Sequence, residues 1–337
     1  MSGLTLRFSP QTLRLMALFL ALLATVLFFS TQIEGYLSAR MFNRISTSAA
    51  VVLPIAVGQA IVIMTRNIDL SAGSILGVVA YMTGQALGAM PEMHPVLAVL
   101  LAMGIGAVAG AINGILIAWG RVPSIIVTLG TLALFRSFLV EYSGATTITT
   151  ASLPQWLVDL PQANLFTIGA LDMRVTVVMA LAACVVVGLA LSRLRAARKF
   201  LAVGSNPDAA RMAGIDAQRV VFVAFVLAGA LSGLSGFIFL AKFGNITVVA
   251  GLGFELKSIA AVVVGGVSIM GGSGTIFGVL IGTVLVDTID NSLTRWDMVS
   301  EFWRDALLGM LIMAAVTLDT LAARQLARLR RKEGGAE

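Results

Sequence analysis

Few side chains in this 337-residue sequence could carry out covalent chemistry. The only histidine is His94, in a short loop with Pro91, Glu92 and Pro95, and the only cysteine is Cys184, inside an apolar run. No histidine dyad, Ser-His-Asp set or His/Cys metal cluster can be built from His94 in this loop. We interpret His94 as a solvated loop residue and Cys184 as a core residue without a disulfide partner. We therefore expect no enzymatic activity and no cofactor bound by this chain.

The glycine-rich stretch 271–275, with the sequence GGSGT, has some similarity to a phosphate-binding loop. A phosphate loop of that type needs a lysine directly before its final serine or threonine, so that the ammonium group reaches the phosphates. No lysine precedes Thr275, and both flanks are apolar. We predict a tight turn with close backbone packing, and no nucleotide site.

Two carboxylates, Asp287 and Asp290, lie three residues apart in an apolar stretch, followed by Asn291. At this spacing on a helix both side chains share one face. Ionisable groups in such a stretch are costly and indicate function. A proton or cation relay would use this pair, and so would a polar helix end that faces an outer vestibule. The second interpretation is favoured, and both stay open.

A polar break at 64–74, with the sequence MTRNIDLSAGS, separates two apolar runs. Asn67, Asp69 and Ser71 lie at this break, and Asp69 is placed to lead or cap the following helix. Helices interrupted in this way bind polar solutes near the middle of a membrane. A plain turn with an Arg66–Asp69 ion pair explains the pattern equally well.

The composition indicates the medium in which these groups lie. Hydrophobic residues make up 58% of the sequence and charged residues 12%, against roughly a quarter charged in soluble domains. Long apolar runs recur, whereas a membrane barrel shows short alternating segments. We predict an all-α polytopic bundle. Arg121, Arg136 and Glu141 lie near the expected ends of spans, from which they reach the headgroups.

We expect about ten spans within one transmembrane domain that covers 1–337. The sixth and seventh are separated by a basic loop at about 194–218, and a basic tail follows at about 322–337. The predicted spans are 12–29, 47–64, 70–89, 96–119, 123–142, 173–192, 219–241, 255–270, 275–293 and 304–321.

Lysine and arginine in the loops predict the orientation. The N-terminal segment, the 194–218 loop and the tail are basic, whereas the 143–172 loop contains neither lysine nor arginine. Loops rich in lysine and arginine stay in the cytoplasm. Both termini should therefore lie inside a bacterial inner membrane, although Arg40 and Arg44 would then lie outside, against the rule. The net charge of +6 is explained by these span ends, so we expect membrane lipid and no nucleic acid as a partner.

The basic loop contains the signals of a short helix. Asn206 can cap it, Pro207 suits the first helical position, Asp208 lies at the positive end of the helix dipole, and Gly214 can end it. We predict a separate helix on the cytoplasmic face, and an ordinary ordered loop is the alternative.

The sequence resembles one family of bacterial ATP-binding-cassette (ABC) importer permeases, the class that takes up ribose, xylose, rhamnose and autoinducer-2. Its motifs occur in family order. Residues 65–69 (TRNID) and 303–305 (WRD) are most similar to the autoinducer-2 branch, and rhamnose permeases are similar there too. Many sugar permeases have two glycines where Arg66 and Asn67 stand. The matching stretches are 66–74 (RNIDLSAGS), 123–131 (PSIIVTLGT), 203–215 (VGSNPDAARMAGI) and 256–266 (LKSIAAVVVGG) with 271–275.

The resemblance implies a partnership. Two permeases, identical or merely homologous, form the path. Two cytoplasmic ATPases that use ATP drive it, and a periplasmic solute-binding protein delivers a small sugar-like solute. Coupling to the ATPase would use Gly204, Ser205, Asn206, Pro207, Asp208, Ala209, Ala210, Arg211 and Gly214. The translocation path candidates are Asn67, Asp69, Ser71, Thr128, Thr131, Asp287, Asp290 and Asn291.

Two other classes of function remain. A secondary proton- or ion-coupled carrier would use Asp287 and Asp290 as its relay. A membrane enzyme is disfavoured because no catalytic set is present.

Overall fold

The computed structural model describes residues 10–169, 171–296 and eight further positions between 298 and 317. Most of the predicted tenth span and the whole basic tail lie outside the described residues. The elements are α1 (Pro10–Gln32), α2 (Ala39–Met64), α3 (Ala72–Ala89), α4 (Pro95–Ala118), α5 (Ser124–Ser143), a 3₁₀ turn (Thr150–Ser152), α6 (Gln155–Asp159), β1 (Asn164–Ile168), β2 (Leu171–Arg174), α7 (Val175–Arg193), α8 (Arg195–Ser205), α9 (Pro207–Met212), α10 (Ala217–Phe243), α11 (Phe254–Val264) and α12 (Ile276–Arg295).

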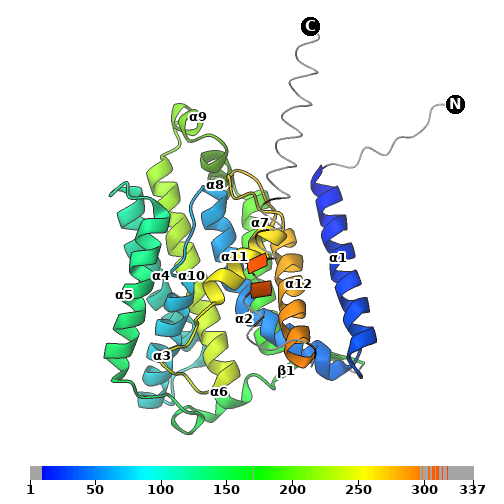
Figure 1. Ribbon diagram of the computed structural model, residues 1–337. Coiled ribbons are helices and arrows are strands. Elements are labelled where there is room, and N and C mark those ends of the chain that lie inside the picture. The colour runs from blue at the N-terminus through cyan, green and yellow to red at the C-terminus, as the bar shows by residue number, and fades with distance from the viewer. Residues whose placement is uncertain are drawn as a thin grey trace, which may run out of the picture.

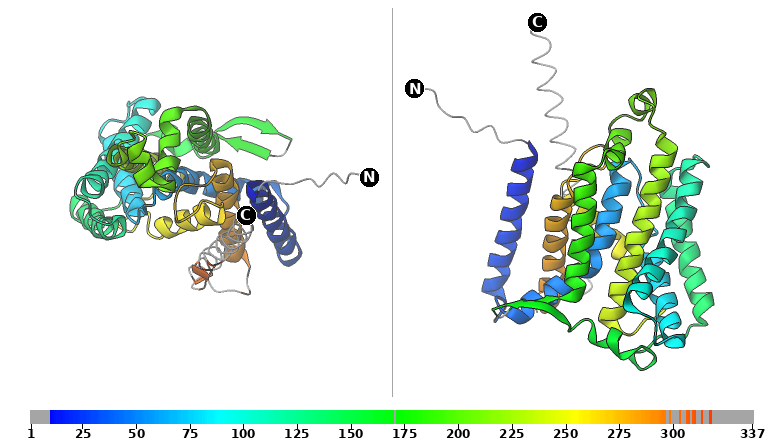
Figure 2. Two further views of the ribbon diagram at one scale, coloured as in Figure 1. Left: turned by 90° about the horizontal axis from the view of Figure 1, so that it is seen from above. Right: turned by 180° about the vertical axis from the view of Figure 1, so that it is seen from behind.

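The long helices lie side by side in one bundle with two distinct ends (Figure 1). The short helices α8 and α9 lie at one end, which we call the α9 end. The short helix α6 and the β1–β2 hairpin lie at the other, which we call the hairpin end (Figure 2). The first turn of α1 lies at the α9 end, as expected if the chain begins on the side of the basic loop.

Eight helices in the described part are long and apolar enough to cross a membrane: α1, α2, α3, α4, α5, α7, α10 and α12. They correspond to eight of the ten predicted spans. The structure is thus the predicted helical membrane bundle.

The predicted eighth span is wrong as a full helix. In its place α11 has 11 residues, which is about 16 Å and half of the ~30 Å hydrocarbon core. Non-helical backbone at 244–253 precedes it, with left-handed φ angles of +77° at Gly251 and +83° at Gly253. These glycines permit the turn because L side chains rarely adopt such angles.

Close helix packing depends on glycine at the contact between α4 and α10. A Cβ atom added at Gly106 or Gly110 would collide with the backbone of α10, at Gly229 and Phe225 respectively. Small residues of this kind let membrane helices approach each other. The α2 helix is buried from Ala49 to its last residue, Met64, whereas α1 is mostly exposed.

The hairpin corrects the expectation of a purely helical chain. Strands β1 and β2 pair antiparallel, with Ile168 opposite Leu171. The Asp172 carboxylate binds Arg174 at 3.1 Å and accepts a hydrogen bond from Asn43 of α2 at 3.2 Å. Strand β2 occupies residues 171–174, where the sixth span was predicted to begin at 173. Helix α7 starts only at Val175.

The α1–α2 connection packs on α12. The Tyr36 hydroxyl lies 2.7 Å from the Ser292 hydroxyl, and burial raises the pKa of Tyr36 above its ordinary value, more than this hydrogen bond lowers it.

Candidate functional site

Residues of the α2–α3 break form a buried polar cluster with α4 and α5. Asp69 Oδ1 accepts hydrogen bonds from the backbone nitrogen and the hydroxyl of Ser71, at 2.9 and 2.6 Å. Asn113 Nδ2 donates to the Ser71 hydroxyl at 2.8 Å, and Thr131 donates to Asn113 Oδ1 at 2.7 Å. A continuous hydrogen-bonded chain therefore joins α5, α4 and the first turn of α3.

Two side chains in the first turns of α5 also hydrogen-bond to the backbone of the α2–α3 break. The Ser124 hydroxyl accepts from the backbone nitrogen of Ile68 at 3.2 Å, and the Thr128 hydroxyl lies 3.3 Å from the Ile68 carbonyl oxygen. These bonds satisfy backbone groups that a broken helix leaves without a helical partner.

The predicted path residues Asp69, Ser71, Thr128 and Thr131 are thus brought together, and Asn67 lies beside them. Asp69 and Ser71 are fully buried. Among the described residues, Asp69 Oδ2 has no hydrogen-bond partner. The cluster is closed to solvent in this conformation, and the predicted Arg66–Asp69 pair is not formed.

The short helix α11 begins beside the first turn of α3. A Cβ atom at Gly73 would overlap the Glu255 carboxylate and the Gly251 carbonyl oxygen. Arg136 donates to the carbonyl oxygens of Val248 and Ala250 at 3.1 and 2.6 Å. Arg136 therefore does not extend to the headgroups as predicted, because it binds the backbone of the non-helical segment.

Lys257 of α11 binds the two predicted carboxylates of α12. Its Nζ lies 2.6 Å from Asp287 Oδ1 and 2.7 Å from Asp290 Oδ2. Asn291 donates to Asp287 Oδ2 at 3.1 Å, and Ser48 of α2 donates to Asp287 Oδ1 at 3.1 Å. Asp287 is 0% exposed, so it lies in a buried ion-pair cluster and not at an open vestibule.

Arg66 connects the break to the α9 end. It has a left-handed φ of +65°, which costs an L residue about 1–2 kcal/mol. Its Nε and Nη2 donate to the carbonyl oxygens of Gly204 and Ser205, at 2.5 and 2.7 Å. Those carbonyls lie in the last turn of α8, where a cation is favourable. The side chain thus joins α2 to the segment that was predicted to couple.

Comparing two variants at this position separates the strain from the hydrogen bonds. Arg66→Ala keeps the left-handed strain and loses both bonds, whereas Arg66→Gly relieves the strain. We expect Arg66→Ala to be less stable than Arg66→Gly by about 1–2 kcal/mol. Thermal unfolding of the two purified proteins measures the difference, and equal stability would contradict the account of strain at this residue.

The predicted short helix in the basic loop is present as α9. Asn206 Oδ1 accepts from the backbone nitrogens of Asp208 and Ala209, at 3.1 and 3.0 Å, and Gly214 follows the helix with a φ of +75°. Gly204 and Ser205 belong to the end of α8 instead.

The two faces of α9 differ. Ala210 is 5% exposed and packs on the chain itself, whereas Met212 is 91% exposed at the tip. Asp208 and Arg211 are exposed as well. A partner at this end would meet Asp208, Ala209, Arg211 and Met212, and it would not meet Ala210.

The 271–275 turn is confirmed and lies against the same segment. Gly271 and Gly272 have φ angles of +78° and +73°. The Gly272 nitrogen donates to the Met64 carbonyl oxygen at 3.0 Å, and a Cβ atom there would collide with Ser205. The end of α2, the end of α8 and this turn therefore form one packed junction.

Comparison with known proteins identifies this architecture. Residues 41–316 match the family model described as branched-chain amino acid transport system / permease component. The chain belongs to this permease family. It is a multi-pass protein of the bacterial inner membrane. No solved structure matches the permease significantly.

The permease is similar to several proteins named Autoinducer 2 import system permease protein LsrC. Identity to that of Escherichia coli O9:H4 (strain HS) is 35% over 302 residues, 89% of this chain and 85% of the relative. For Enterobacter sp. (strain 638) it is 35% over 318 residues, 94% and 90% of the two chains. For Yersinia enterocolitica (serotype O:8 / biotype 1B, strain NCTC 13174 / 8081) it is 34% over 300 residues, 89% and 81%. These relatives are transport permeases and not enzymes.

Sequence reasoning missed Asn113 and Lys257 of the permease. Asn113 is a single amide within an apolar run, and Lys257 is a single cation within another. Each was a detectable signal, because a polar group in a span calls for a buried partner.

Proposed function

We propose that this permease is the membrane-spanning subunit of an ABC importer for a small sugar or sugar-like solute. Autoinducer-2, rhamnose and a pentose are the candidate solutes, and the names of the relatives favour the first. The observation that carries the coupling part of this proposal is α9, a capped helix whose outer face is exposed and which directly follows the end of α8 that Arg66 binds.

In this account the chain itself performs no covalent chemistry and binds no cofactor, because the partner ATPase uses the ATP. The ATPase contacts the exposed face of α9 and moves it as the two ATPases close. The packed junction of Arg66, Gly204 and Gly272 transmits that movement to the α2–α3 break. Rearrangement there opens the path alternately to each side of the membrane.

The partners follow from the same account. The α9 end faces the cytoplasm, and the hairpin end faces a periplasmic binding protein that delivers the solute. A second permease, identical or homologous, completes the path. The whole chain, 1–337, acts as one permease domain.

A secondary carrier that uses Asp287 and Asp290 as a relay is not favoured. Lys257 binds both carboxylates, and Asp287 is fully buried. A relay needs carboxylates that exchange protons with water, and Asp287 is closed to water in this conformation.

Solute uptake tests the proposed function. Cells would express the chain with the ATPase and binding protein encoded beside it, and uptake of labelled autoinducer-2, rhamnose and ribose would be measured. We expect uptake to vanish when the phosphate-loop lysine of the ATPase is changed to alanine, because the chain has no other source of energy in this account. Uptake that persists in that variant and collapses with a proton uncoupler would support the carrier instead.

A further inference from the structure

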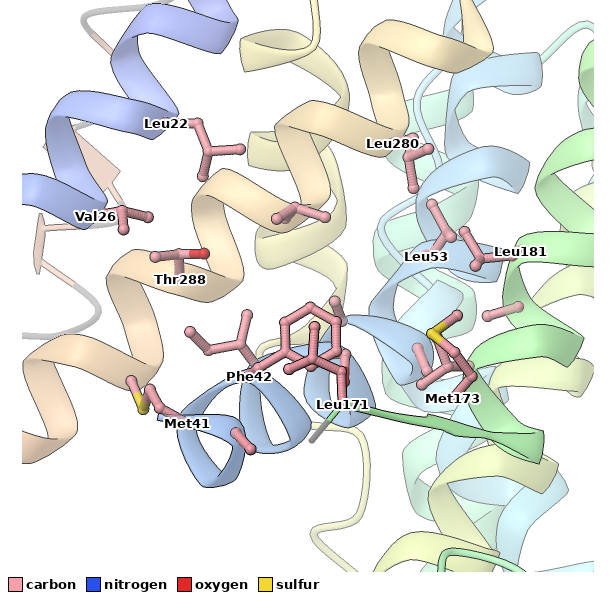
Figure 3. A pocket seen from close by; sticks show the side chains of 18 of the residues that line it. Leu22, Val26, Met41, Phe42, Leu53, Leu171, Met173, Leu181, Leu280 and Thr288 are labelled. Atoms are coloured by element: carbon pink, nitrogen blue, oxygen red, sulfur yellow. The ribbon is translucent and has the colours of Figure 1, made fainter. Parts of the chain in front are cut away.

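Cavities in the two halves of the bundle differ in charge. The groove between α1 and α2 has no charged side chain among the described residues that line it (Figure 3). A cavity of about 380 Å³ at the α9 end is lined by Arg66, Arg121 and Arg211, and by no carboxylate among the described residues. Its volume is within the range of ~300–1,000 Å³ found for ligand pockets. We call it the arginine cavity.

Two long helices begin at the arginine cavity. Ser124 in the first turn of α5 lines it, as do Ala217 and Gln218 in the first turn of α10. Backbone nitrogens in a first turn have no helical partner and lie at the positive end of the helix dipole. The helix ends and the arginines therefore favour the same kind of occupant, an anion.

Arg121 is held in an unfavourable conformation without a partner in the described structure. Its φ of +57° is left-handed, and its guanidinium forms no ion pair or hydrogen bond with the described residues. Arg66 also has a left-handed φ, and its side chain binds the end of α8. Backbone strain of this kind is concentrated at ligand sites. A ligand would explain Arg121 as the α8 carbonyls explain Arg66.

Nearby carboxylates do not neutralise the cavity. A second cavity shares Arg121 and Arg211 with it and adds Asp216. The Asp216 carboxylate lies 2.9 Å from Arg219 Nε, so that arginine offsets its charge. Asp208 lies 4.0 Å from Arg211 and its side chain is 90% exposed, and a surface pair of this kind contributes little. The cavity therefore keeps a net positive charge.

The general excess of basic residues at cytoplasmic span ends explains only part of this pattern. That rule places arginines at the α9 end, but it requires neither three of them around one cavity nor left-handed backbone at two of the three. Guanidinium groups bind phosphate oxygens in two-pronged geometry. Several arginines together suit the two charges of a phosphate ester better than the single charge of a carboxylate.

We propose that the arginine cavity binds a phosphate group, carried by a small phosphate ester or by a lipid headgroup. Arg121 and Arg211 bind the phosphate oxygens. Arg66 has five N–H donors, of which two bind the end of α8, and its charge completes the site. The bound group joins α9 to the α4–α5 connection. The cytoplasmic location of the site rests on the proposed function, whereas binding itself does not.

Calorimetric titration of the full-length permease in phosphatidylcholine nanodiscs tests the proposal. The probes are glycerol 3-phosphate and glycerol, which differ only in the phosphate group and are not candidate solutes. We expect one glycerol 3-phosphate to bind and glycerol not to bind. Arg121→Gln should weaken binding about 10-fold or more, because it removes hydrogen bonds between charged groups. Glutamine keeps the left-handed strain, so the backbone conformation is matched.

Two variants act as controls. Arg195→Gln removes an exposed arginine of α8 that does not line the cavity, and it should leave binding unchanged. Asp216→Asn keeps a residue that can cap α10 and removes the carboxylate beside Arg121 and Arg211. It should tighten binding several-fold, a gain that a misfolded protein would not give.

The lipid composition of the nanodisc distinguishes the two sources of phosphate. If phosphatidylglycerol weakens binding of glycerol 3-phosphate to the unmodified permease more than to Arg121→Gln, a lipid headgroup occupies the site. If it weakens both alike or neither, the site takes a soluble ester. No binding of glycerol 3-phosphate in phosphatidylcholine, or equal affinity with and without Arg121, would overturn the proposal. Neither ATPase nor uptake enters this experiment, so its failure would leave the proposed function standing.

Discussion

The Lys257→Met variant is expected to lose about 3–5 kcal/mol of stability, the cost of leaving a buried charge without its partner. Lys257 lies within 2.7 Å of both carboxylates of α12, and Asp287 is 0% exposed. Methionine preserves much of the side-chain volume but not the charge. Thermal unfolding of the purified permease measures the loss, and uptake should fall with the amount of folded protein.

The matched control also removes the negative charge of Asp287, which Lys257→Met would leave buried without a cation. The double variant Lys257→Met/Asp287→Asn should recover most of the stability, because Asp290 is partly exposed and tolerates the loss better. In our account the double variant also retains ATP-driven uptake. If it folds normally but transports nothing, a relay through Asp287 gains support and the structural role fails.

The Met212→Asp variant is expected to reduce uptake by about 30-fold or more with little change in permease abundance. A central apolar contact in an interface contributes ~2 kcal/mol or more, and Met212 is 91% exposed. Its change therefore disturbs a partner contact and not the fold of the chain. Uptake and the amount of ATPase that copurifies with the permease measure the effect.

Ala210→Glu separates coupling from folding on the same short helix. Ala210 is buried against its own chain, so glutamate there should lower the unfolding temperature, which Met212→Asp should leave unchanged. Leu165→Asp, at an exposed position of the hairpin, should leave ATPase copurification intact. Normal uptake and copurification with Met212→Asp would exclude α9 as the coupling element.

The parts of the fold that depend on local signals could be predicted from the sequence. Hydropathy located the eight long helices, since an apolar run of span length has few other structures in a bilayer. Asn206, Pro207 and Gly214 predicted α9 because capping acts over a few adjacent residues. The break at Asp69 was predicted for the same reason.

The remaining features depend on contacts between distant segments. Hydropathy did not distinguish a full span from the half-length α11, because the non-helical backbone before it is held by Arg136 of α5 and by close packing on Gly73 of α3. The environment of Asp287 could not be predicted without knowing that α11 places Lys257 beside it. The hairpin depends on the pairing of β1 with β2, where the alternation of apolar residues is too short to distinguish from a loop.

Site-directed crosslinking tests the central claim, that the ATPase contacts the exposed face of α9. The assembled transporter would carry Met212→Cys with Cys184→Ala, so that the permease has a single cysteine. A short crosslinker with two reactive ends would be added, a maleimide for this cysteine and an amine-reactive group for a lysine of the ATPase. A Leu165→Cys permease in the same background is the control. The account predicts a permease–ATPase product with Met212→Cys and none with Leu165→Cys. An assembled transporter that gives no such product at Met212, or gives it equally at Leu165, would contradict it.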